Sequence, residues 1–134
     1  MLKLNSLFLI LFLLACQSTP FLENNVDLIS VNASAPAKDR VLVKLTIRNN
    51  NDFAGRVTAA ATVNCGTVTW REKKETAILQ PQAQSTITVE FVGREDRIPT
   101  MAKTFEYQGF VYGRDGRVLT TSEEKHGKKP YGRP

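Results

Sequence analysis

Few side chains in this chain could act as an acid, a base or a nucleophile. The only histidine, His126, lies in the polar segment 123–129, which has no apolar period and is predicted to lack fixed structure. A general base needs a partner that orients it, and such a segment offers none. We therefore interpret His126 as a solvated side chain.

Cys65 is the second residue with potential chemistry. It falls on the apolar face of a predicted strand, where a free cysteine is usually an inert small hydrophobe. A reactive thiol is one alternative, although no histidine lies nearby in sequence to lower its pKa. Pairing with a cysteine of another molecule is a second alternative, which would require an oxidising compartment.

The acidic residues and glycines do not form a recognisable metal or nucleotide motif. The adjacent acidic pairs, Glu95–Asp96 and Glu123–Glu124, lack the ligand spacing of calcium or zinc sites. The glycines are scattered at turns and build no phosphate-binding loop. We expect no catalytic residue, no metal and no cofactor. The sequence therefore predicts a protein that is not an enzyme and has no small-molecule substrate.

The N-terminus has the pattern of an export signal. Lys3 supplies one positive charge, and residues 7–14 are an unbroken apolar run. This run is too short to cross a bilayer, which needs about 20 helical residues. The pattern therefore predicts a removable signal peptide over residues 1–15.

Residues 13–16, which span the end of the predicted signal peptide, resemble the lipobox of bacterial lipoproteins. Leu13-Leu14-Ala15-Cys16 has an aliphatic residue three places before the cysteine and a small residue directly before it. The resemblance implies that Cys16 receives a diacylglyceryl group and, after cleavage, an acyl chain on its amino group. An ordinary secretory signal is the alternative. Gln17, where many inner-membrane lipoproteins have Asp, favours the outer membrane of a Gram-negative envelope.

The segments that would position any site are predicted strands. Apolar and polar residues alternate over 41–48, 57–65 and 87–91, and a hairpin is predicted over 105–120 with its turn at Asp115-Gly116. A further strand is expected around 26–31. A bulge at Gly66 would carry the apolar face on to Trp70, whereas residues 71–84 are read as polar, with a turn at 79–81.

About seven short strands without a helical stripe predict an all-β protein, an antiparallel immunoglobulin-like two-sheet sandwich. A transthyretin-like strand order is the alternative. Residues 26–112, with their Asn-rich turn at 49–51 and the turn Leu79-Gln80-Pro81, resemble the small FxLYD and LEA14-type domains of exported lipoproteins. The expected organisation is a signal peptide (1–15), a lipidated cysteine and tether (16–25), a β-sandwich (26–121) and a basic disordered tail (122–134).

These features favour a membrane-anchored binding module or adaptor for another envelope protein, which could dock by pairing with an edge strand. The predicted interface consists of Trp70, Arg71, Phe110 and Tyr112. Core packing is the alternative for the aromatic side chains of the predicted strands, which are Trp70, Phe105, Tyr107, Phe110 and Tyr112. The net charge of +5 suggests a second function, the binding of an anionic envelope polymer or lipid. That function would use the tail residues Lys125, Lys128, Lys129 and Arg133. A solvated tail is the alternative, and nucleic acid is not an expected partner of an exported protein.

Overall fold

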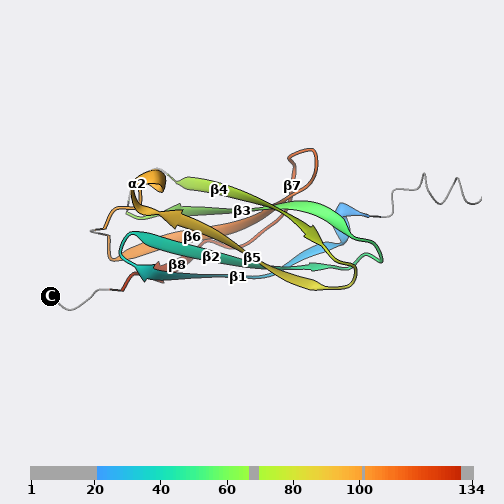
Figure 1. The fold of residues 1–134 in the computed structure, drawn as a ribbon, viewed down its shortest axis with the longest axis horizontal. Coiled ribbons are helices and arrows are strands. Elements are labelled where there is room, and N and C mark those ends of the chain that lie inside the picture. Colours follow the sequence, from blue (N-terminus) through green and yellow to red (C-terminus); the bar gives the residue numbers. More distant parts are fainter. Residues whose placement is uncertain (1–20, 67–69, 101, 131–134) are drawn as a thin grey trace, which may run out of the picture.

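The protein forms a sandwich of two antiparallel sheets in a computed structural model that describes residues 21–66, 70–100 and 102–130 (Figure 1). The first sheet has the order β1-β2-β5, and the second has the order β4-β3-β6-β7, with β8 also paired to β6. The strands are β1 (Val26–Ala37), β2 (Arg40–Asn49), β3 (Gly55–Asn64), β4 (Arg71–Leu79), β5 (Gln84–Val92), β6 (Thr104–Tyr112), β7 (Val118–Thr121) and β8 (Lys125–Lys128). Two short helical turns complete the described elements, η1 (Glu23–Asn25) and α2 (Gly93–Asp96). The predicted all-β sandwich is confirmed.

The core lies between the sheets because alternate residues of each strand point inward. In β2 these residues are Val41, Val43, Leu45 and Ile47, and all four are fully buried. From the second sheet, β3 and β6 contribute residues such as Val63, Phe105 and Val111. A Cβ atom on Gly109 of β6 would lie 2.7 Å from Cγ2 of Val31, so this position lets the two sheets approach closely.

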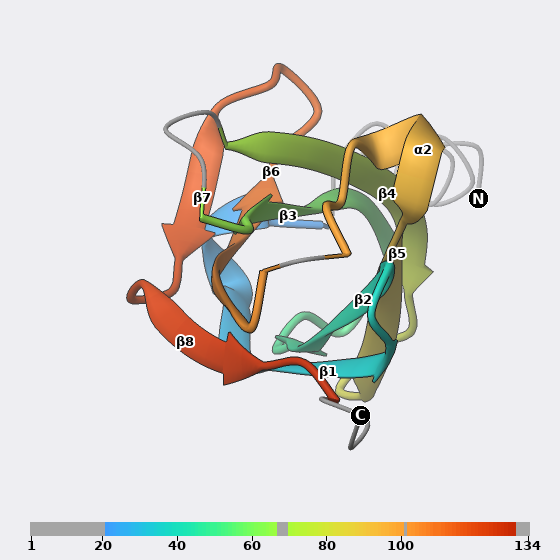
Figure 2. The same ribbon diagram turned by 90° about the vertical axis from the view of Figure 1, so that its left-hand side faces the viewer.

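The view along the long axis shows how the sheet edges meet (Figure 2). Strand β4 lies beside β5, and β1 lies beside β8. The α2 turn and the N-terminal segment lie at opposite ends of the sandwich. The molecule therefore has two distinct ends, one at α2 and one where the described chain begins at Phe21.

Most predicted strands are confirmed, but the prediction at Gly66 is wrong. Gly66 has φ 79°, and β3 and β4 on either side of it pair antiparallel, so the chain reverses instead of continuing past a bulge. Residues 71–79, read as a polar segment, form the edge strand β4. An edge strand needs no fully apolar face, so β4 can carry many charged residues and lacks the alternating pattern that predicts a strand.

The tether and tail predictions also need correction. Part of the tether belongs to the domain, because Phe21 packs against the core and Leu22 is hydrogen-bonded to Asn51. Part of the tail is ordered, because Lys125–Lys128 forms β8 against β6. Gly127 lets β8 pack closely on Phe105 of β6, since a Cβ atom at position 127 would lie 2.2 Å from Cζ of Phe105. The signal peptide, Cys16 and Arg133 lie outside the described residues.

Candidate functional site

The loop between β5 and β6 is held at the α2 end by main-chain and carboxylate contacts. The N–H of Gly93 donates to the carbonyl of Asp39 at 2.7 Å, and the N–H of Ile98 donates to the carbonyl of Gly93 at 2.8 Å. The carboxylate of Asp96 accepts from the N–H of Val92 at 2.6 Å and from Lys73 Nζ at 3.1 Å. These contacts fix the backbone from which Arg94 and Arg97 project.

A pocket of about 580 Å³ opens at this end, and we call it the arginine cleft. Its walls come from the β1–β2 turn, the start of β4 and the α2 loop. They consist of Asp39, Arg71, Gly93, Arg94, Arg97, Ile98, Pro99 and Thr100. Three positive charges therefore surround one pocket together with a single carboxylate.

The guanidinium groups of the three arginines make no hydrogen bond or ion pair with any other described residue. Arg94 and Arg97 are exposed, and Arg71 is half-buried. Guanidinium groups present a planar fork of N–H donors that matches carboxylate and phosphate oxygens. The cleft is therefore chemically suited to an anionic group, beside an apolar surface from Ile98 and Pro99.

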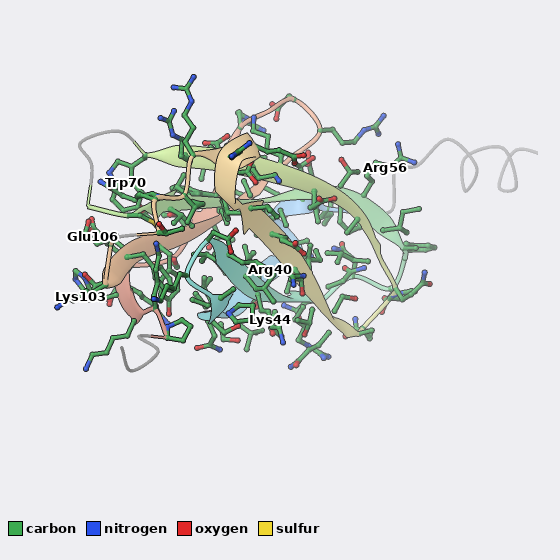
Figure 3. The ribbon with its side chains drawn as sticks, turned by 60° about the vertical axis from the view of Figure 1, so that its left-hand side comes forward. Arg40, Lys44, Arg56, Trp70, Lys103 and Glu106 are labelled. Atoms are coloured by element: carbon green, nitrogen blue, oxygen red, sulfur yellow. The ribbon has the colours of Figure 1, made fainter. Side chains whose placement is uncertain are left out.

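The predicted interface residues separate into two places. Trp70 and Arg71 lie at the α2 end, where both line a second pocket of about 400 Å³ that shares Arg71 and Arg97 with the cleft. Figure 3 shows Trp70 and Lys103 at one end of the molecule and Arg56 at the other. Sequence reasoning found Arg71 but missed Arg94 and Arg97, although the run Arg94-Glu95-Asp96-Arg97 after a strand could have indicated them.

Phe110 and Tyr112 lie on the outer face of the second sheet, half-buried among their neighbours. Their rings stack with centroids 6.1 Å apart, and Lys74 Nζ lies 4.8 Å from the Tyr112 centroid. Burial, together with the nearby Glu72 carboxylate, raises the pKa of Tyr112. Phe110 and Tyr112 are therefore only partly accessible to a partner.

The tail lysines are mostly committed to the fold. Lys125 Nζ donates to the carbonyl of Val31 at 2.9 Å. Lys129 is 5% exposed and its Nζ donates to the carbonyl of Pro99, while burial lowers its pKa. Lys128 is exposed. The predicted free basic patch is therefore not present over residues 125–129.

The remaining candidates for chemistry are a buried thiol and an exposed imidazole. Cys65 is buried beside the core, and burial raises the pKa of its thiol. His126 is exposed on β8, which corrects the expectation that its segment lacks structure. Over the described ranges, no group of three or more His, Cys, Asp or Glu side chains could hold a metal ion. The described part of the chain also has no helix long and apolar enough to cross a membrane.

Comparisons with known proteins support the fold alone. No family model matches the chain, and no curated protein matches it. Among solved structures, it is similar to a putative β-galactosidase from Bacteroides fragilis over 77% of this chain, with 15% identity and a TM-score of 0.55. A β-glucuronidase from Bacteroides uniformis matches over 79% of this chain, with 9% identity and a TM-score of 0.56.

A β-glucosidase from Erythrobacter marinus matches over 78% of this chain, with 12% identity and a TM-score of 0.55. The chain spans 16%, 13% and 15% of these three enzymes, respectively. The similarity therefore concerns one β-sandwich within much larger proteins.

Proposed function

We propose that this chain is an envelope lipoprotein, anchored through Cys16, that acts as a non-catalytic binding module for another envelope protein. The arginine cleft is the proposed docking site. The observation that carries the proposal is the gathering of Arg71, Arg94 and Arg97 around one pocket without internal ion pairs. Arginine is among the residues most enriched at energetically important positions of protein interfaces.

The chemistry of the cleft favours an acidic protein segment as its ligand. Carboxylates of the partner would pair with the guanidinium groups, and its apolar side chains would pack on Ile98 and Pro99. A simple polyanion offers charge but nothing to cover the apolar wall. Trp70 beside the cleft supplies a large ring of the kind that anchors interfaces.

Edge-strand pairing, the docking mode expected from the sequence, has less support than the cleft. The β4 edge carries five consecutive charged residues, 71–75, which discourage strand addition. The β1 edge contains two register shifts and Pro36, which interrupt a regular ladder. A partner that meets side chains at the α2 end avoids both obstacles.

The proposed role is non-catalytic because one of the two candidates for chemistry is buried and the other has no partner among the described residues that orients it. Cys65 is buried with a raised pKa, so its reactive thiolate is disfavoured. His126 is exposed on β8, and its ring makes no hydrogen bond with a described residue that would orient it as a base. The glycosidase activities of the similar structures belong to chains of which this one spans a small part.

The second candidate, binding of an anionic polymer or lipid, would also act at the cleft. Binding through the tail has less support, because two of its four predicted cations, Lys125 and Lys129, donate to backbone carbonyls. Lys128 alone stays exposed among the described tail lysines. A polymer is therefore the competing ligand for the same three arginines.

The test is affinity purification of the tagged protein from detergent-solubilised, lightly cross-linked cells. The Arg71→Gln, Arg94→Gln, Arg97→Gln triple variant is compared with wild type, a Cys16→Ser variant and a charge-matched control. The control is Arg56→Gln, Arg114→Gln, Arg117→Gln, which removes three exposed arginines from outside the cleft.

We expect one envelope protein to be enriched with wild type and the control, and reduced at least about tenfold with the cleft variant. Enrichment should also be lost with Cys16→Ser. Equal enrichment by both triple variants would overturn the cleft as docking site. If no protein is enriched, and wild type binds a purified anionic polymer that the cleft variant does not bind, polymer binding would replace the adaptor function.

A further inference from the structure

The end of the sandwich opposite the cleft exposes large apolar side chains. Leu22, Phe53 and Ile78 are 52%, 51% and 58% exposed. Leu22 lies next to the first described residue, Phe53 lies in the β2–β3 turn, and Ile78 lies one residue before the end of β4. We call these three residues the apolar end.

Two buried asparagines hold the three segments of the apolar end together. Asn51 Nδ2 donates to the carbonyl of Leu22 at 2.9 Å, and Asn51 Oδ1 accepts from the N–H of Leu22 at 2.8 Å. Asn49 Nδ2 donates to the carbonyls of Phe53 at 2.9 Å and Leu79 at 3.3 Å. The amides of Asn49 and Asn51 are themselves joined at 2.9 Å, so the apolar side chains rest on a fixed support.

These hydrogen bonds also give main-chain polar groups of the apolar end internal partners, which lowers the cost of moving them out of water. Both polar groups of the Leu22 main chain are satisfied by Asn51, and the Leu22 carbonyl accepts additionally from the N–H of Asn25. The Phe53 carbonyl is satisfied by Asn49. An unpaired backbone group costs several kcal/mol in lipid, so a segment that enters a membrane interface needs such internal partners.

The sequence places this end close to the proposed lipid anchor. Five residue steps separate Cys16 from Phe21, and even a fully extended chain would span at most about 18 Å over that distance. Phe21 packs against the core and over Gly55, so the tether enters the domain at the apolar end. A lipidated Cys16 would hold Leu22 and Phe53 near the headgroups.

We infer that the apolar end lies on the lipid surface, with Leu22 and Phe53 inserted into the headgroup interface. This inference rests on the lipid anchor of the proposed function. Apolar side chains that enter the interface add buried area to the anchoring that the lipid chains on Cys16 would supply. The contact would also fix the orientation of the domain, with the arginine cleft directed away from the membrane.

The experiment uses the full mature protein, purified with its lipid and reconstituted into phosphatidylcholine vesicles with or without brominated acyl chains. Trp70, the only tryptophan, lies at the α2 end and serves as the internal control. In a Phe53→Trp, Trp70→Phe variant the reporter moves to the apolar end. Phe53 is half-exposed, so the larger ring can be accommodated.

We expect brominated lipid to quench the tryptophan at position 53 at least about twofold, with a blue-shifted emission, and to leave Trp70 unchanged. Equal, weak quenching at both positions in protein whose Cys16 mass confirms lipidation overturns the inference and leaves the cleft untouched. If the mass shows no lipid, the anchor fails instead. Quenching at position 53 without lipid would then still support membrane contact.

Discussion

The two ends of the sandwich differ in which side chains are buried and which are exposed. At the apolar end, neutral amides of Asn49 and Asn51 are buried and apolar side chains are exposed. At the α2 end, an ionisable side chain, Lys129, is buried and the arginines of the cleft are exposed. The two ends therefore differ in the kind of side chain that they bury and in the kind that they expose.

This difference indicates how one small domain can face two environments. A membrane interface favours apolar side chains on a backbone whose polar groups have internal partners, as do both main-chain groups of Leu22 and the carbonyl of Phe53. An acidic partner favours unpaired guanidinium groups on a fixed loop, which is the arrangement at Arg94 and Arg97. The long axis of the sandwich separates the two surfaces.

The largest stability effect is expected at the apolar end. Asn49→Ala removes donors to the carbonyls of Phe53, Leu79 and Gln80 and an acceptor for Asn51, all in a fully buried position. Unsatisfied buried groups are costly, so we expect a loss of about 3 kcal/mol in the free energy of unfolding, measured with urea. Asn50→Ala, on the exposed neighbour, is the control and should cost less than about 0.5 kcal/mol. Equal losses in both variants would show that the asparagine network does not hold this end together.

A smaller, pH-dependent effect is expected at the α2 end. Burial lowers the pKa of Lys129 below its ordinary value of 10.5, so the unfolded chain binds more protons than the native protein between the two pKa values. The contribution of Lys129 to stability should therefore rise as the pH increases toward 10.5. The free energy of unfolding in urea is measured against pH for Cys65→Ala and for Cys65→Ala, Lys129→Met. Both proteins lack the neighbouring thiol, so the difference between their pH dependences reports Lys129. A difference between the two proteins that stays constant with pH would contradict a depressed Lys129 pKa.

Period-2 alternation was sufficient to predict most of the sandwich. It located the central strands because their inward faces are uniformly apolar, as in Val41, Val43 and Leu45 of β2. It missed β4 and β8 because edge strands are partly exposed to solvent and need fewer apolar residues. The charges of β4 and the Lys125–Lys128 run resemble a polar loop and a tail.

The candidate site was predictable only in part, because the cleft is a product of tertiary structure. Arg71 stood out beside Trp70, but Arg94 and Arg97 reach the same pocket through the fold of the β5–β6 loop. Conversely, Lys129 looked like a free cation in sequence, and its contact with Pro99 depends on the pairing of β8 with β6. Sequence pattern reports which side chains are charged, whereas packing decides which of them remain available.

The most direct test of separate tasks at the two ends is photo-cross-linking in living cells, with a photoreactive amino acid placed at Thr100 or at Phe53. Thr100 lines the arginine cleft without being one of its arginines, and both side chains are exposed, so neither replacement disturbs the core. Position 100 should give an adduct with one envelope protein, and position 53 should give adducts with lipid and no protein. A protein adduct at position 53 together with none at position 100 would contradict the account, because the partner would then occupy the end assigned to the membrane.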